Sequence, residues 1–333
     1  MSPTVFEHPS FSTARLDRAA EKRDDKLWIE QQHQHAHTLY VPLWRNRCLV
    51  QEIQRGESNT AYRALMLDHQ AIAPLAQSPH APTLLGRHSG HSYFGVTVGD
   101  AMAKQLSEQH QASFQDLRRV IDHLDTLDAG ILAYAKAMHY WQHRHTFCGV
   151  CGHSNHLISA GHRMRCSNSE CARDTFPRID PAIIVLVTHD DACLLGRHRS
   201  WPATRYSTLA GFVEPGESLE EAVAREVLEE SSVELKSVRY RSSQPWPFPA
   251  SAMAGFYAEA HSKHLRVDED ELEHAQWLTA ADIREQVQAG TLSLPTPYSI
   301  AFSLIAQWYQ EQTGEDPMQL LQWHTQATSA RPS

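Results

Sequence analysis

The most constraining feature of this sequence is a pattern of glycines, charged residues and apolar residues between Gly211 and Val233. It opens with the loop 211–217, whose two glycines permit a tight turn and a close approach of the backbone to a ligand. A helix is predicted next, from Leu219 to Ser231, because Ser218 and Glu221 match a capping box and apolar residues then recur at helical spacing. We therefore expect a glycine-containing loop that leads directly into an amphipathic helix.

Three glutamates of this predicted helix are spaced so that their carboxylates can meet. Glu226, Glu229 and Glu230 stand at positions i, i+3 and i+4, which share one side of a helix. Carboxylates so close repel one another, and a hard divalent cation such as Mg²⁺ or Mn²⁺ relieves that repulsion. Arg225 and Glu217 are predicted to form an ion pair that orients the carboxylates. The alternative is a solvated acidic helix face, and the accompanying loop and arginine favour the metal site.

The whole pattern resembles the Nudix box, G-x5-E-x7-R-E-U-x-E-E-x-G-U, at every fixed position except one. Ser232 stands where the box has its last glycine, at a position expected to be left-handed, which costs a non-glycine residue about 1 kcal/mol. This departure removes no metal ligand, so we expect activity to survive. The resemblance implies a Nudix hydrolase, with an α/β/α sandwich around a mixed sheet and metal-dependent hydrolysis of a pyrophosphate attached to a nucleoside.

A second motif follows the box and reads S-Q-P-W-P-F-P-A-S from Ser243 to Ser251. Its prolines and aromatic residues make a stiff segment of low helical propensity, suited to holding aromatic faces around a flat base. A proline-rich edge loop is the alternative. At this distance from the box, the motif resembles the array of the NADH pyrophosphatase branch of the Nudix family, which implies NADH or NAD⁺ as the substrate. Ala250 departs from the branch, whose members often carry Gln there.

Four cysteines in two close pairs, with the spacing C-x2-C-x14-C-x4-C, precede the box. They are Cys148, Cys151, Cys166 and Cys171. Such a set is typical of a structural zinc ribbon, although the second pair is two residues wider than in the branch. His153, His156 and His162 are nearby alternative ligands. A disulfide is less favoured because nothing in the chain suggests secretion.

The resemblance also implies the role of individual residues. The implied ligands of Mg²⁺ or Mn²⁺ are Glu226, Glu230, Glu271 and the carbonyl of Ala210, with Glu229 as a further catalytic carboxylate. Glu271 is assigned by its distance to Trp277, and Glu269 and Glu273 are its neighbouring alternatives. The implied substrate-binding residues are Phe176, Phe212, Gln244, Pro245, Trp246, Pro247, Phe248, Pro249, Ala250, Ser251 and Ala301.

The expected fold class is α+β, and the motifs divide the chain into five segments. These are a polar, partly disordered N-terminal segment (1–30), an α+β N-terminal domain (31–142), a zinc ribbon (143–177), the Nudix domain (178–312) and a mobile polar tail (313–333). We predict a loose helix from Ser10 to Lys26, and a helix from about Phe114 to Trp141 that is broken near Gly130. A strand from Ala182 to Thr188 is predicted to return as a hairpin through Cys193–Gly196.

The composition agrees with a globular protein, at 41% hydrophobic and 21% charged residues. The longest apolar run, Ala182 to Val187, is too short to span a membrane, and no signal peptide is recognisable, so we expect a cytoplasmic location. The net charge of −9 argues against broad nucleic-acid binding. Cys48 and Cys193 are predicted to be buried thiols, and the histidines at 33, 35 and 37 to form solvated surface.

The reaction that these features predict is hydrolysis of NADH or NAD⁺ to AMP and nicotinamide mononucleotide. The same chemistry could remove an NAD cap from the 5′ end of RNA, which is the nearest alternative. A broader Nudix hydrolase acting on ADP-ribose is less favoured because the second motif is intact. A non-catalytic nucleotide sensor is less favoured because every glutamate of the box is present. A homodimer is implied by the resemblance, and Phe176 would suit a contact with a partner's site.

Overall fold

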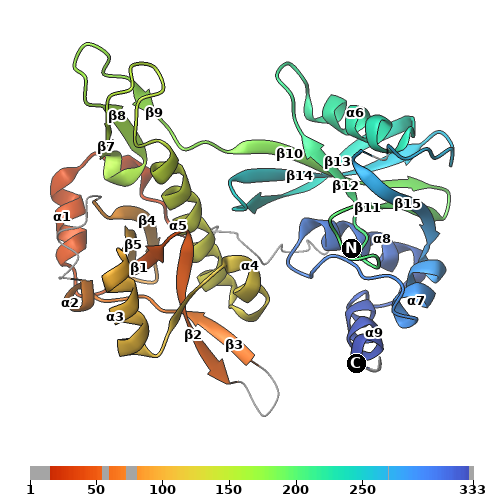
Figure 1. Ribbon diagram of the computed structural model, residues 1–333, viewed down its shortest axis with the longest axis horizontal. Coiled ribbons are helices and arrows are strands. Elements are labelled where there is room, and N and C mark those ends of the chain that lie inside the picture. The colour runs from red at the N-terminus through yellow and green to blue at the C-terminus, as the bar shows by residue number, and fades with distance from the viewer. Residues whose placement is uncertain (1–15, 55–59, 73–80, 269, 330–333) are drawn as a thin grey trace. The chain divides into compact units, whose positions relative to one another are not determined.

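The computed structural model describes residues 16–54, 60–72, 81–268 and 270–329 (Figure 1). Contacts within these residues divide the chain into two units. The N-terminal unit contains the described residues up to Ile179 together with 246–250, and the C-terminal unit contains 180–245 and the described residues from Ser251 onward.

A mixed sheet forms the centre of the N-terminal unit. Its strands are β1 (Thr38–Trp44), β2 (Arg47–Gln54), β3 (Thr60–Ala64), β4 (Thr83–His88), β5 (His91–Thr97) and β6 (Ser113–Gln115). They lie in the order β3-β2-β1-β5-β4, with β6 beside β2, and only β1 and β5 pair in parallel. The helices are η1 (Ala20–Lys22), α1 (Lys26–Gln34), α2 (His69–Ile72), α3 (Asp100–His110), α4 (Leu117–Val120), η3 (Ile121–His123) and α5 (Thr126–Arg144).

The predicted break near Gly130 is wrong, because α5 runs through that residue without interruption. The interruption lies earlier, where Asp125 caps α5 by accepting a hydrogen bond from the backbone N–H of Asp128 at 2.9 Å. A side-chain cap of this kind stabilises the helix start, because it satisfies an N–H that has no partner inside the helix. The single glycine at 130 destabilises the helix too little to interrupt it where the helix is buried. Upstream, Phe114 belongs to β6 rather than to a helix.

Two expectations for the N-terminal region are also corrected. Of the loose helix predicted from Ser10 to Lys26, residues 10–15 lie outside the described residues, and the rest contains only the short η1 before α1 begins. Partial disorder stays a prediction for residues 1–15, which lie outside the described residues, whereas Leu16 and Ala19 are buried. His33 is half-buried against Tyr40 and Phe94, with its Nδ1 3.0 Å from the Tyr40 hydroxyl, whereas His35 and His37 are exposed as expected.

The cysteine-rich segment forms a small antiparallel sheet at the end of α5. Its strands are β7 (Asn155–Ile158), β8 (Arg163–Cys166) and β9 (Asp174–Thr175), in that order, with η4 (Ser159–Gly161) between β7 and β8. Arg165 forms an ion pair with Asp174 across β8 and β9 at 2.7 Å. Part of the basic character of this segment is therefore neutralised within the small sheet.

A second mixed sheet forms the C-terminal unit, in the order β13-β14-β10-β11-β15 with β12 beside β10. The strands are β10 (Asp180–His189), β11 (Ala192–His198), β12 (Leu209–Phe212), β13 (Leu235–Trp246), β14 (Ser251–Ala260) and β15 (Leu272–Thr279). The predicted strand and its hairpin return are confirmed as β10 and β11. The thiol of Cys193 is fully buried in β11, as is that of Cys48 in β2.

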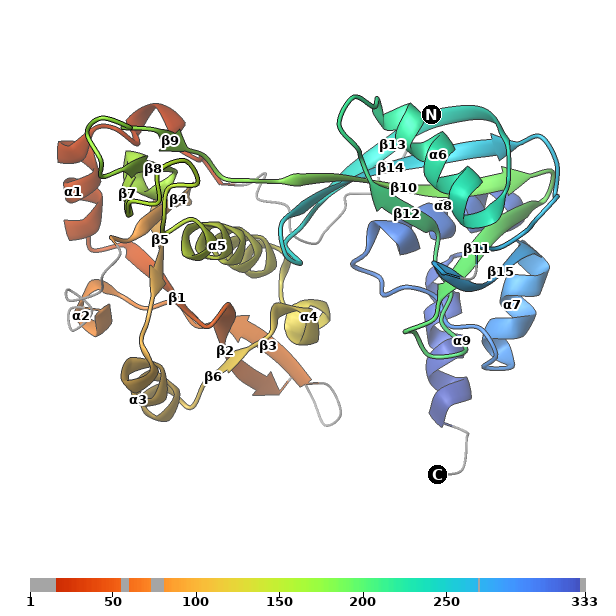
Figure 2. The ribbon, with the colours of Figure 1, turned by 45° about the horizontal axis from the view of Figure 1, so that its top comes forward.

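Helices cover both faces of this sheet (Figure 2). They are α6 (Leu219–Ser231) on one face, and α7 (Ala280–Gln288), α8 (Ile300–Thr313) and α9 (Met318–Ser329) on the other. Alternate residues of β10 point to opposite faces, so Ile183 packs with α6 while Ile184 packs with α8. The expected α/β/α sandwich is confirmed.

The expectation of a mobile polar tail is wrong up to Trp323. Gly314 ends α8 in a left-handed conformation, and α9 begins four residues later. Leu320 is buried in the core beneath α7 and α8, and Trp323 packs against the same core. A membrane-spanning helix is absent from the described residues, since none of their helices combines the required length with the required apolar character.

Replacing Ser232 by glycine should stabilise the C-terminal unit. Ser232 has φ 56° and ψ 22°, the left-handed conformation expected after α6. Glycine adopts this conformation without the clash of a Cβ, so Ser232→Gly should raise the free energy of unfolding by about 1 kcal/mol. Urea unfolding measures the change, and Ser232→Ala is the matched control because alanine retains the Cβ. Equal stability of the glycine and alanine variants would contradict this account.

Candidate active site

The helix α6 is held at both ends as its sequence predicts. Ser218 Oγ accepts a hydrogen bond from the N–H of Glu221 at 3.2 Å, and the Glu221 carboxylate accepts one from the N–H of Ser218 at 2.8 Å. This reciprocal capping box is confirmed, and it satisfies two backbone N–H groups at the start of the helix. The N–H of Ser232 closes the other end by donating to the carbonyl of Leu228.

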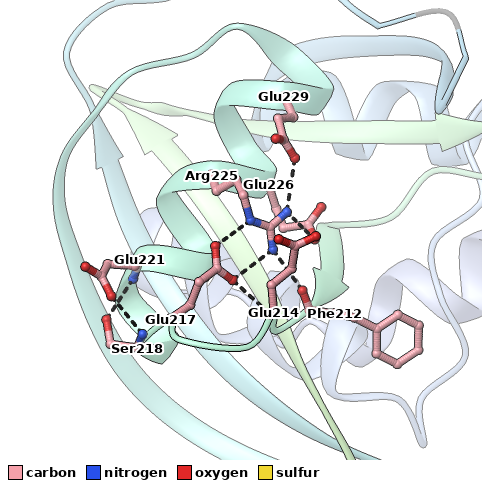
Figure 3. Close-up of polar contacts among 8 residues, drawn as sticks. All are labelled: Phe212, Glu214, Glu217, Ser218, Glu221, Arg225, Glu226 and Glu229. Carbon is pink, nitrogen blue, oxygen red and sulfur yellow. Dashed lines mark hydrogen bonds and ion pairs between the residues drawn. The ribbon is translucent and has the colours of Figure 1, made fainter.

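Arg225 is the centre of the polar contacts around this loop (Figure 3). Its Nε lies 2.6 Å from Glu217 Oε1, which confirms the predicted ion pair. A second nitrogen, Nη2, donates to the backbone carbonyl of Phe212 at 2.9 Å. The third, Nη1, lies 3.0 Å from both Glu226 Oε1 and Glu229 Oε2. The hydrogen bond from Arg225 lowers the pKa of Glu217, so that carboxylate stays charged in its role as anchor.

The carboxylates of Glu226, Glu230 and Glu271 gather at one point, with an oxygen of each within 4.8 Å of the others. Glu226 and Glu230 come from successive turns of α6. Glu230 is 7% exposed, and its Oε2 has no hydrogen-bond partner. Burial, together with the charges of Glu226 and Glu271, raises the pKa of Glu230 to about 8. Burial also raises the pKa of Glu226.

Gly211 makes room for this cluster. A Cβ placed on Gly211 would overlap the carboxylate carbon and both carboxylate oxygens of Glu226. The glycine stands in β12, where Ala210 and Gly211 pair with Ile184 and Ile183 of β10. The first glycine of the box is therefore required by the close approach of a carboxylate to the backbone, rather than by an unusual φ.

Glu271 reaches the cluster because backbone hydrogen bonds tie the preceding segment to the end of α6. The N–H of Arg266 donates to the carbonyl of Ser231 at 3.0 Å, and that of Asp268 donates to the carbonyl of Glu230 at 3.1 Å. Of the two alternatives to Glu271, Glu273 instead forms an ion pair with Arg197 at 3.2 Å, and Glu269 lies outside the described residues.

Glu229 lies outside this cluster. Its side chain is 54% exposed, and its carboxylate forms an ion pair with Arg225 at 3.0 Å. The structure thus separates the three glutamates that the sequence groups together. Glu226 and Glu230 meet Glu271, whereas the Glu229 carboxylate lies against the Arg225 guanidinium, outside the cluster.

The cluster has the chemistry of a divalent metal site. Three carboxylates supply only oxygen ligands, which suit hard cations. Glu230 Oε2 is buried without a hydrogen-bond partner, and buried polar atoms in folded proteins normally have one. Burial, followed by the charges of Glu226 and Glu271, raises the pKa of Glu230. A cation bound by Glu226, Glu230 and Glu271 would stabilise the charged form of all three carboxylates.

The S-Q-P-W-P-F-P-A-S motif runs from the end of β13 through the connection 247–250 to Ser251, the first residue of β14. Trp246 and Phe248 pack edge to face, with ring centroids 5.2 Å apart and planes at 79°. Gln244 is 1% exposed, and both ends of its amide are occupied. Its Nε2 donates to the carbonyl of Tyr298 at 2.6 Å, and its Oε1 accepts from the N–H of Ile300 at 2.8 Å. Gln244 thus holds the start of α8, a role that the sequence did not indicate.

The remaining implied substrate residues differ in their exposure. Phe212 is 60% exposed, and its ring points away from the charged groups around Arg225 (Figure 3). Phe176, in the N-terminal unit, is 62% exposed. Ala301 is buried near the start of α8, and Ser251 is buried at the start of β14. Of these four residues, Phe212 and Phe176 are therefore the two whose side chains are open to a ligand.

The four cysteines form a second cluster, in the N-terminal unit. The Sγ atoms of Cys148 and Cys171 are 3.8 Å apart, those of Cys151 and Cys166 are 3.4 Å apart, and all four lie within 4.8 Å of one another. A backbone hydrogen bond from His153 lowers the pKa of Cys151 to about 6, whereas burial raises that of Cys166 to about 12. Four converging sulfurs fit a tetrahedral zinc site, and the wider second pair does not prevent convergence.

The comparisons with known proteins agree with this geometry. Residues 178–294 match the family model described as NUDIX domain, and residues 37–141 match one described as NADH pyrophosphatase-like rudimentary NUDIX domain. The chain is 30% identical over 335 residues to a protein of Macaca fascicularis named NAD-capped RNA hydrolase NUDT12, with 90% of this chain and 72% of the relative covered. The chain belongs to the Nudix hydrolase family.

Two bacterial relatives support the same placement. The chain is 36% identical over 264 residues to the NAD-capped RNA hydrolase NudC of Klebsiella pneumoniae, covering 77% of this chain and 94% of that protein. It is 40% identical over 202 residues to the NudC of Pseudomonas syringae, covering 61% and 69%. The resemblance to the NADH pyrophosphatase branch is therefore confirmed, and the Nudix domain carries the carboxylate cluster.

Replacing Gly211 by alanine should disable the Nudix site while leaving the fold intact. The added Cβ must displace the Glu226 carboxylate, and a misplacement of about 1 Å commonly lowers kcat about 100-fold. Steady-state hydrolysis and circular dichroism measure the two effects. Gly99→Ala is a matched control, because a Cβ at Gly99 would meet no atom within 4 Å. Full activity of Gly211→Ala would contradict the close approach described here.

The stability of the metal-free protein should fall as the pH rises through the pKa of Glu230. The pKa of this group is about 8 in the folded protein and 4.5 in the reference state, so the folded state holds the extra proton between these values. The corresponding stability is complete below about pH 4.5, declines as the pH rises between these values and is lost above about pH 8. Without Mg²⁺ and Mn²⁺, the Tm of wild type should therefore fall relative to Glu230→Gln between pH 5 and pH 9. Parallel Tm curves for the two proteins would contradict this assignment.

Proposed function

We propose that this protein hydrolyses the pyrophosphate of NAD, both in the free dinucleotide and as the 5′ cap of RNA. The observation that carries the proposal is the convergence of Glu226, Glu230 and Glu271 beside the glycine loop of a Nudix domain. The intact S-Q-P-W-P-F-P-A-S motif supports a nicotinamide dinucleotide, and the names of the relatives support the capped RNA.

The reaction adds one water molecule to a phosphorus atom and breaks one P–O bond of the bridge. Free NAD⁺ or NADH then yields AMP and the corresponding nicotinamide mononucleotide, and capped RNA yields 5′-monophosphate RNA and nicotinamide mononucleotide. Mg²⁺ or Mn²⁺, when bound, would activate the water and neutralise charge on the phosphoryl group. We propose Glu226, Glu230, Glu271 and the carbonyl of Ala210 as its ligands.

Arg225 and Glu229 are proposed to support these ligands. Arg225 lies 3.0 Å from Glu226 and holds the loop carbonyl of Phe212, so it limits where the Glu226 carboxylate can move. Glu229 shares Arg225 and is exposed, which leaves it free to accept a proton or a further metal contact when substrate binds. The residues of the cluster thus differ in role, although all belong to one box.

The aromatic groups are proposed to hold the bases of the dinucleotide. Phe212 presents an exposed ring directly after Gly211. Within the segment 245–250, the half-buried rings of Trp246 and Phe248 pack edge to face, and we propose this segment as a further base-binding element. Gln244 holds the start of α8, beside which Ala301 lies, and Ser251 is buried at the start of β14. We further propose that Phe176 acts within a homodimer, and that the four cysteines hold a structural zinc ion.

Product analysis tests the proposed function. The purified protein is given NADH, NAD⁺, ADP-ribose and NAD-capped RNA with Mg²⁺ or Mn²⁺, and the products are separated by HPLC and identified by mass. We expect AMP and nicotinamide mononucleotide from the free dinucleotides, and nicotinamide mononucleotide from the capped RNA.

Glu230→Gln should keep the fold and lower kcat at least about 100-fold, because the neutral amide removes a charged ligand. Glu234→Gln is the control, because Glu234 is an exposed glutamate just beyond the box. Near-full turnover of Glu230→Gln would overturn the metal assignment. Faster turnover of ADP-ribose than of NAD would overturn the substrate assignment.

A further inference from the structure

The loop between β11 and β12 concentrates positive charge beside an aromatic ring. Residues 197–205 read Arg-His-Arg-Ser-Trp-Pro-Ala-Thr-Arg, without a single acidic residue, in a chain whose net charge is −9. His198, Arg199 and Arg205 are exposed, and Trp201 is half-buried. The metal chemistry of the carboxylate cluster does not use this loop.

Trp201 is the centre of the loop. The Arg205 guanidinium lies 5.4 Å from the centroid of its ring, and the His198 ring centroid lies 6.1 Å away at an interplanar angle of 46°. An aromatic ring flanked by cationic or ionisable groups is the arrangement on which single-stranded nucleic acids stack their bases while their phosphates meet the cations.

The loop is held in this shape before any ligand arrives. The N–H of Trp201 donates to the carbonyl of His198 at 3.0 Å, and that of Arg205 donates to the carbonyl of Pro202 at 2.9 Å. Arg197 donates from Nη1 to the carbonyl of Ala203. The N–H of Ser293 donates to the carbonyl of Thr204 at 2.7 Å. These bonds reduce the ordering that binding would otherwise require.

Both ends of the loop lead to the carboxylate cluster. His198, where the loop leaves β11, pairs with Leu272, the residue that follows Glu271. At the other end, Ser207 exchanges backbone hydrogen bonds with Gly196, and the chain enters β12 toward Gly211, against which Glu226 lies. A strand of RNA with its cap phosphates at the cluster would therefore continue past a neighbouring cationic and aromatic surface.

We propose that the loop 198–205 binds the first nucleotides that follow the cap in single-stranded NAD-capped RNA. A base stacks on Trp201, and Arg199 and Arg205 contact the phosphates on either side. The inference rests on the proposed function, because it places the RNA chain relative to the pyrophosphate that is hydrolysed. It extends that function to the RNA chain, because capped RNA has nucleotides beyond the cap that can reach this loop, whereas free NAD has none.

The experiment compares two substrates of each protein: free NAD⁺ and an unstructured NAD-capped RNA of eight nucleotides. The variants are Trp201→Ala and the double substitution Arg199→Ala/Arg205→Ala. Trp201→Phe tests rescue by a smaller ring, and Arg239→Ala is an exposed arginine of β13 outside the loop. For the loop variants we expect kcat/KM on capped RNA to fall about tenfold, and kcat/KM on NAD⁺ to stay within about twofold. The double variant should also weaken the dependence of kcat/KM on salt.

A second measurement separates this proposal from the proposed function. Fluorescence anisotropy of the uncapped 5′-monophosphate RNA reports binding without any turnover, and the loop variants should bind it about tenfold more weakly than wild type and Arg239→Ala. Equal losses on NAD⁺ and capped RNA, or loop variants with unchanged kinetics and anisotropy, would overturn the proposal. Wild type that hydrolyses neither substrate would overturn the proposed function, while the anisotropy comparison would still decide whether the loop binds RNA.

Discussion

One cation, Arg225, connects the parts of the Nudix box that the chain's local geometry cannot connect alone. It contacts Glu217 in the loop, the Phe212 carbonyl at the end of β12, and Glu226 and Glu229 on α6. The loop, the strand and the helix therefore keep one relative position, and Glu226 lies against Gly211 as a result. Without this guanidinium, Glu217, Glu226 and Glu229 would lose their shared ion-pair partner. Among the described residues, Arg225 is also the one cation that forms an ion pair with Glu226.

The three clustered carboxylates also carry more negative charge than the neighbouring Arg225 can neutralise. Arg225 lies 3.0 Å from one oxygen of Glu226, and Glu230 is buried without a partner for one of its oxygens. Burial penalises a charged carboxylate, and the neighbouring carboxylates add to the penalty, so the metal-free site retains a proton. A divalent cation bound by these carboxylates would replace that proton. The repulsion that destabilises the three charged carboxylates would then favour binding of the cation.

Local signals in the sequence predicted the elements around the site, and they failed where distant contacts decide. The capping box follows from neighbouring residues, the left-handed Ser232 follows from the glycine position of the Nudix box, and both are observed. Glu271 was reached only through the family resemblance, since backbone bonds from the segment 266–268 to α6 bring it in. The tail assigned as mobile was wrong as far as Trp323, because Leu320 is buried in the distant core. One error had a local cause instead: the break assigned to Gly130 overlooked the Asp125 cap, which sets the start of α5. The structural use of Gln244 has no sequence signal at all.

The most direct test of the account is the affinity for Mn²⁺, measured by electron paramagnetic resonance in wild type, Glu271→Gln and Glu273→Gln. The two variants remove equivalent charges two residues apart, but only Glu271 lies in the carboxylate cluster, while Glu273 pairs with Arg197. We predict that Glu271→Gln weakens Mn²⁺ binding at least about tenfold and that Glu273→Gln leaves it unchanged. Unaltered affinity in Glu271→Gln, or equal losses in both variants, would contradict the claim that these three carboxylates form the metal site.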